Sequence, residues 1–119
     1  MELVAFVGPD QETWGQITAL MNRMPECEKV VLVVAKGVSG FPVDGKTRVV
    51  EVDASLPLVE LKEAMWSGLK KELDGAFEVA LTLASGKGKE HMALVGALLS
   101  IPVGIRIAVF TKEGVRFVT

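Results

Sequence analysis

The sequence has one cysteine and one histidine among 119 residues, and these scarcities exclude whole classes of site. With Cys27 alone, neither an intrachain disulfide nor a zinc site built on thiolates can form. His91 has no second histidine and no acidic pair at ligand spacing, so we expect no metal and no cofactor. Asparagine and glutamine are also scarce, which favours a thermophilic source.

No apolar run approaches the roughly 18 residues that a membrane span requires, and no signal peptide precedes the first predicted strand. We therefore expect a cytoplasmic protein without a membrane partner. The net charge is −2, and the lack of a basic excess disfavours binding to duplex nucleic acid. The length indicates a single domain over residues 1–119.

Short apolar runs, rich in β-branched residues and bounded by glycine, proline or charge, predict strands. Helical spacing of apolar residues predicts a helix capped by the Asp10 carboxylate and ended by Pro25, and a longer one between Pro57 and Gly75. A third, almost wholly apolar helix is predicted over residues 88–100. The predicted strands cover residues 2–7, 29–35, 47–53, 77–83, 105–111 and 115–118.

This alternation of buried strands with helices predicts an α/β fold. We expect a three-layer, Rossmann-like sandwich around a mostly parallel sheet of about six strands, closed by a C-terminal β-hairpin. The strand 47–53 alternates at its end, which indicates a place near the edge of the sheet.

In such a sheet, ligands bind beyond the carboxyl ends of the strands, where the strand order reverses. If the first strand lies in the middle, with the second and fourth on either side, two loops meet there. They are Gly8-Pro9-Asp10 and residues 84–89.

The second loop, within ASGKGKEHM, has the chemistry of a phosphate site. Gly86 and Gly88 allow a close backbone approach and a positive φ, and Lys87 and Lys89 add charge. Ser85 adds a hydroxyl, and the following helix presents free N–H groups. The alternative is an ordinary turn kept in solvent by its lysines.

A dinucleotide fingerprint and a P-loop both fit poorly. His91 holds the third glycine position of the fingerprint, the loop follows the fourth strand rather than the first, and Ala35-Lys36 stand where an acid is expected. No serine or threonine follows the loop lysine. His91 is either a proton-transfer residue or a partly exposed polar residue, and Trp14 either packs or stacks a base.

The helix 88–100 is apolar on nearly every face and carries small residues at Ala93, Gly96 and Ala97. Burial on both sides is therefore expected, with the sheet on one side and a second copy of the chain on the other. The alternative is that other parts of the chain cover the outer side.

The stretch ALTLASGKGKEHMALVGALLS resembles the signature of CARF domains, the CRISPR-associated Rossmann fold. In that family a strand ends in a glycine-rich loop with a basic residue, and an apolar residue opens the helix. Gly86 and Lys89 match the loop, Met92 matches the apolar start, and Gly8-Pro9-Asp10 corresponds to the other family motif. The loop departs from the family pattern in gaining Lys87 and lacking a threonine.

The resemblance implies a homodimer that binds a cyclic oligoadenylate messenger in CRISPR-linked antiviral defence, as a stand-alone sensor or sink. Since the chain ends at Thr119, we expect no effector domain. One alternative is a metal-independent ring nuclease, with Ser85, Lys87 and Lys89 as candidate catalytic residues. Another is a small α/β protein that binds a different anionic metabolite or a protein partner. The expected ligand-binding residues are Gly8, Pro9, Asp10, Ser85, Gly86, Lys87, Gly88 and Lys89.

Overall fold

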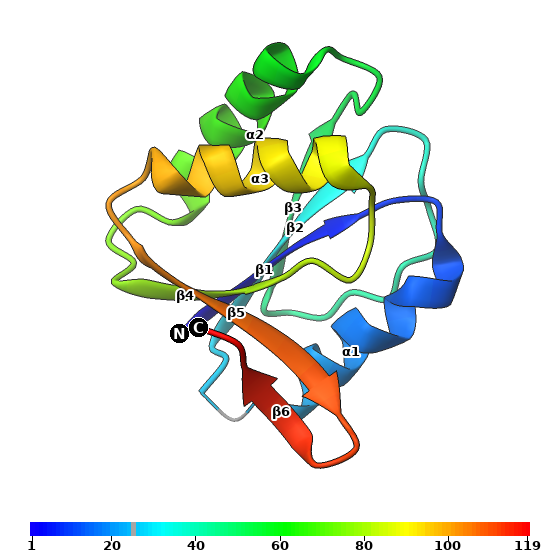
Figure 1. Ribbon diagram of the computed structural model, residues 1–119, viewed down its shortest axis with the longest axis vertical. Coiled ribbons are helices and arrows are strands. Elements are labelled where there is room, and N and C mark those ends of the chain that lie inside the picture. The colour runs from blue at the N-terminus through cyan, green and yellow to red at the C-terminus, as the bar shows by residue number, and fades with distance from the viewer. Residues whose placement is uncertain (25) are drawn as a thin grey trace.

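The computed structural model describes residues 1–24 and 26–119, and over these residues the predicted α/β sandwich is confirmed (Figure 1). Pro25, predicted to end the first helix, lies outside the described residues. The elements are β1 (Glu2–Val7), the 3₁₀ turn Gln11–Thr13, α1 (Trp14–Arg23), β2 (Lys29–Ala35), β3 (Thr47–Val52), α2 (Leu58–Glu72), β4 (Glu78–Thr82), α3 (Gly88–Leu99), β5 (Gly104–Thr111) and β6 (Gly114–Phe117).

The strands form one sheet in the order β3-β2-β1-β4-β5-β6. The first five strands are parallel, and β6 pairs antiparallel with β5 as the predicted hairpin. Strand β3 is at the sheet edge, as expected from its alternating end. Because β1 lies between β2 and β4, the order of strands reverses beside β1, and the predicted switch point is confirmed.

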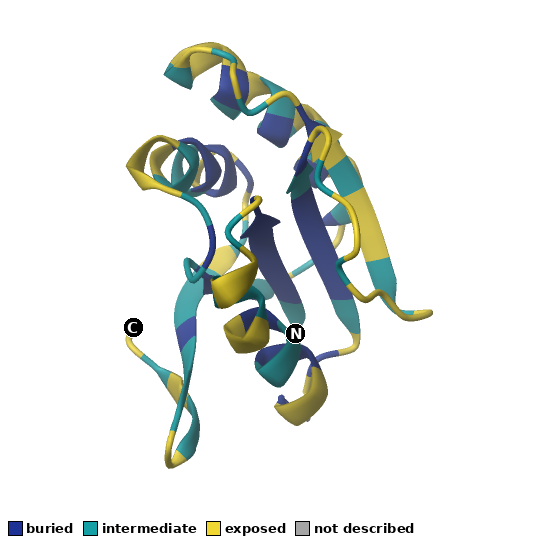
Figure 2. Cartoon of the chain, turned by 90° about the vertical axis from the view of Figure 1, so that its right-hand side faces the viewer, coloured by how far each residue is buried: buried dark blue, intermediate teal, exposed yellow. Residues whose placement is uncertain are grey.

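Helices α2 and α3 cover one face of the sheet, and α1 covers the other (Figure 1). Successive side chains of β1 point to opposite faces, so Phe6 packs beneath α2 and α3 while Ala5 packs against α1. Figure 2 shows the buried strands between these layers. This double coverage explains why β1, β2 and β4 are continuous apolar runs in the sequence.

One local prediction is wrong: the Asp10 carboxylate does not cap the first helix. A single 3₁₀ turn precedes α1, and the side chain of Asp10 makes no hydrogen bond to the N–H groups of that turn. The carboxylate instead accepts hydrogen bonds from the loop after β4. None of the helices in the described ranges is long and apolar enough to cross a membrane.

Candidate functional site

Hydrogen bonds tie the loop after β1 to the loop after β4. The Gly8 N–H donates to Ser85 Oγ (2.9 Å), and the Ser85 hydroxyl donates to Asp10 Oδ1 (2.7 Å). The Gly86 N–H donates to Asp10 Oδ2 (3.1 Å). These three bonds, which we call the Asp10 staple, bring together four of the predicted ligand-binding residues at the switch point.

Two glycines permit this close approach. A Cβ on Gly8 would lie 2.9 Å from Asp10 Oδ1, and a Cβ on Gly86 would lie 2.7 Å from the Phe6 ring. Gly86 also has a φ of +93°, which side-chain-bearing residues rarely adopt. Of the two loop glycines, Gly86 adopts the positive φ that glycine allows, whereas Gly88 is the first residue of α3 and does not.

The staple also sets the ionisation of Asp10. Partial burial raises the pKa of the Asp10 carboxyl, but hydrogen bonds from Ser85 and Gly86 oppose this effect and leave the pKa below its ordinary value. Asp10 is therefore a carboxylate at neutral pH, and its negative charge is directed at donors of the second loop.

Three lysines lie at the same edge of the sheet as the staple. Lys87 is exposed at the start of α3, and Lys89 Nζ donates to the Leu56 carbonyl (2.8 Å). Hydrogen bonds from Ser55 lower the pKa of Asp53, and the charges of Lys36 and Lys89 add to this effect. We call Lys36, Lys87 and Lys89 the basic rim.

Lys36 was not among the predicted site residues. The available signal was that Lys36 directly follows β2, whose carboxyl end lies beside that of β1.

The N-terminus of α3 is the remaining source of donors. The Lys87 N–H donates to Glu90 Oε1 (3.1 Å). Within residues 1–24 and 26–119, no acceptor contacts the N–H groups of Gly88 and Lys89. These two N–H groups and the dipole of α3 can bind an anion.

His91 and Trp14 support the two loops. His91 Nε2 donates to the Ser85 carbonyl (2.8 Å), which holds the second loop against the first turn of α3. Trp14 Nε1 donates to the Gly8 carbonyl (2.9 Å), and its ring packs edge-on against Phe41. These contacts favour the interpretation of Trp14 as a packing residue and that of His91 as a partly exposed polar residue.

Hollows of about 180 and 460 Å³ flank the staple. The smaller lies beside Pro9 and Trp14, and the larger lies between β4, β5 and the start of α1, where Ala84 and Phe110 line it. The larger hollow falls within the size range of small-molecule sites. Over the described ranges, no group of three or more His, Cys, Asp or Glu residues is placed to hold a metal ion.

The Asp10 staple can be tested through stability. Asp10→Ala removes the acceptor of two hydrogen bonds, and we expect the free energy of unfolding in urea to fall by about 1–2 kcal/mol at pH 7. Because the folded-state pKa of Asp10 lies below 3.8, ionisation of Asp10 stabilises the wild-type fold above pH 3.8, and this part of the difference from Asp10→Ala should disappear as the pH falls through the folded value. Glu51→Ala, on exposed edge strand β3, is the control and should change little. An equal loss for both variants would contradict the staple.

Comparison with known proteins assigns no family to this chain. No protein-family model, no curated protein and no solved structure matches it. We therefore infer function from the fold, from the geometry at the switch point and from the chemistry of the loop residues.

Proposed function

We propose that the carboxyl edge of the sheet binds a phosphate-bearing nucleotide, and that this ligand is a cyclic oligoadenylate. The observation that carries the proposal is the meeting of two stapled loops at the switch point. They meet beside the unoccupied N–H groups of α3 and the basic rim. The finer identity of the ligand rests on the resemblance of residues 80–100 to the CARF signature.

The predicted site residues divide into two roles. Gly8, Asp10, Ser85 and Gly86 hold the loops together, because the donors of Ser85 and Gly86 are already directed at Asp10. A phosphate would then be bound by the N–H groups of Gly88 and Lys89, with Lys87 supplying charge from the exposed surface. The flanking hollows leave room for the body of the ligand.

Binding without cleavage is the activity that we propose. Ser85, a catalytic candidate for the ring-nuclease alternative, is only 1% exposed. Its hydroxyl donates to Asp10 and accepts from Gly8, so it is not directed at a ligand. A ring nuclease would have to rely on the lysines to stabilise developing charge, and on the ribose hydroxyl of the substrate as nucleophile.

The proposal includes a homodimer formed through α3. Ala93, Leu94, Ala97 and Leu98 on the inner face of this helix are fully buried. On the outer face, Met92 and Leu99 are 62% and 72% exposed, and they lie seven residues apart on one helical stripe. A twofold pairing of such stripes would bury both residues and place two carboxyl edges near one axis.

Ligand binding can be measured by thermal unfolding with cyclic tetra-adenylate or hexa-adenylate. A ring present at 100 times its dissociation constant should stabilise the protein by about 2.7 kcal/mol, whereas ATP, NAD and linear oligoadenylate should not. Lys87→Gln should reduce the stabilisation, and Lys112→Gln, in the exposed β5-β6 turn, should retain it. Stabilisation by ATP or NAD alone would indicate that the ligand is a different anionic metabolite. No stabilisation by either ring would refute the proposed ligand.

Dimerisation can be measured by sedimentation. The wild-type chain should sediment as a dimer, and Met92→Glu with Leu99→Glu should yield a monomer, because two charges would be buried unpaired in the interface. Val59→Glu changes an equally exposed apolar residue on α2 (64% exposed) and should remain dimeric. A monomeric wild-type chain, or dissociation by Val59→Glu alone, would exclude this interface.

A further inference from the structure

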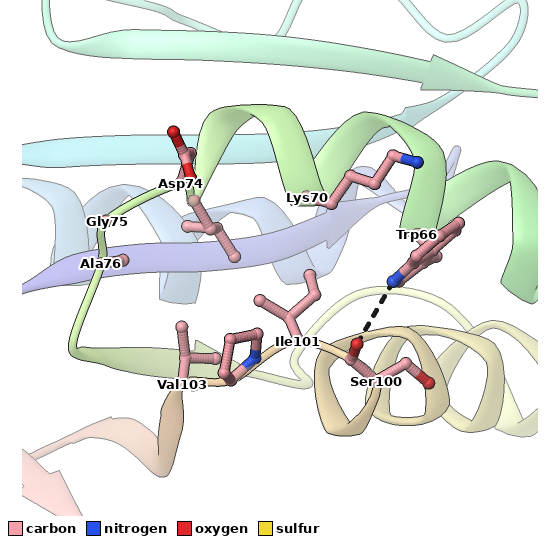
Figure 3. Close-up of a pocket in the computed structure, with 10 residues that line it drawn as sticks. Trp66, Lys70, Asp74, Gly75, Ala76, Ser100, Ile101 and Val103 are labelled. Atoms are coloured by element: carbon pink, nitrogen blue, oxygen red, sulfur yellow. Dashed lines mark hydrogen bonds between the residues drawn. The ribbon is translucent and has the colours of Figure 1, made fainter.

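A separate cleft lies at the opposite edge of the sheet, between the carboxyl ends of α2 and α3 (Figure 3). Its volume is about 310 Å³, at the lower end of the range for small-molecule sites. Leu73 and Ile101 line it and are almost fully buried, and Val103 adds a third apolar side chain. We call this hollow the Trp66 cleft.

Trp66 forms a fixed wall of this cleft. Its Nε1–H donates to the Ser100 carbonyl (3.3 Å), so the indole links the last turns of α2 to the end of α3 (Figure 3). With the N–H satisfied, the ring presents apolar surface toward the cleft.

One residue of each charge lines the cleft, Lys70 and Asp74. Lys70 Nζ lies 4.0 Å from the centroid of the Trp66 ring, and no salt bridge to Lys70 is found among residues 1–24 and 26–119. Asp74 also lines the cleft, but its side chain points away from Ile101 (Figure 3).

A lysine partly neutralises the negative partial charge that the helix dipole places at the carboxyl end of α2. Lys29 pairs with the Glu72 carboxylate (3.2 Å) and also donates to the Glu72 carbonyl. An ammonium resting on an indole face still has N–H donors to offer, so Lys70 can bind an anion without leaving Trp66.

We propose that the Trp66 cleft binds a small carboxylate with an apolar body. The body would pack against Leu73, Ile101 and Val103, and the carboxylate would accept hydrogen bonds from Lys70 Nζ. This site is independent of the nucleotide site at the carboxyl edge, because the two share no lining residue.

The test uses benzoate, benzamide and benzylamine, which have similar shapes and negative, zero and positive charge at pH 7. In ¹H–¹⁵N NMR titrations of the full chain, benzoate should shift the Trp66 indole N–H signal saturably. The Trp14 signal, which comes from the other edge of the sheet, should stay unchanged. Benzamide and benzylamine should bind more weakly than benzoate.

Matched lysine variants locate the charge. Lys70→Gln should weaken benzoate binding about tenfold, as the loss of a charge-assisted hydrogen bond implies, and Lys71→Gln should leave it unchanged. The proposal is overturned if benzylamine or benzamide binds as tightly as benzoate, if both indole signals shift alike, or if Lys70→Gln has no effect. Because both lysines are exposed, neither variant should disturb folding.

Discussion

The Asp10 carboxylate is the constraint on which the carboxyl edge of this protein depends. It accepts hydrogen bonds from Ser85 and Gly86, which are more than seventy residues away in the sequence. Without this acceptor, two donors beside a buried strand would lack a partner, and the loops after β1 and β4 would lose their link. The position of the α3 N-terminus beside the first loop follows from the same link, because Ser85 and Gly86 lead directly into the helix.

Helix α3 connects three surfaces with different chemistry. Its N-terminus contributes N–H groups to the carboxyl edge, and its outer face carries the exposed stripe of Met92 and Leu99. At its other end, the Ser100 carbonyl accepts a hydrogen bond from Trp66 in the Trp66 cleft. Lys87 precedes the helix, and Lys70 of α2 lies over the ring of Trp66, whose indole N–H donates to the Ser100 carbonyl at the other end. The same element would thus serve nucleotide binding, subunit pairing and the carboxylate site.

The sequence predicted much of the fold, because strands buried on both faces must be apolar throughout and their periodicity is visible locally. The convergence of Gly8 and Ser85 was also predictable once β1 was placed between β2 and β4. The hydrogen-bond partner of Asp10 could not be predicted. A carboxylate before a helix normally caps that helix, and only the three-dimensional approach of Gly86 offers a competing donor. The reason for a glycine at position 68 could not be predicted from the sequence either. A Cβ there would clash with the Val50 side chain, in a contact between α2 and β3 that no local pattern encodes.

The central claim is that an anionic ligand binds beside the stapled loops, at the N-terminus of α3. A ¹H–¹⁵N NMR titration with cyclic tetra-adenylate and cyclic hexa-adenylate tests it most directly, since every backbone N–H reports its own surroundings. The account predicts that one of the rings shifts the amide signals of Gly88 and Lys89 most strongly, together with those of Gly8 and Gly86. Shifts confined to the opposite edge, around Ser100 and Val103, or no shift with either ring, would contradict it.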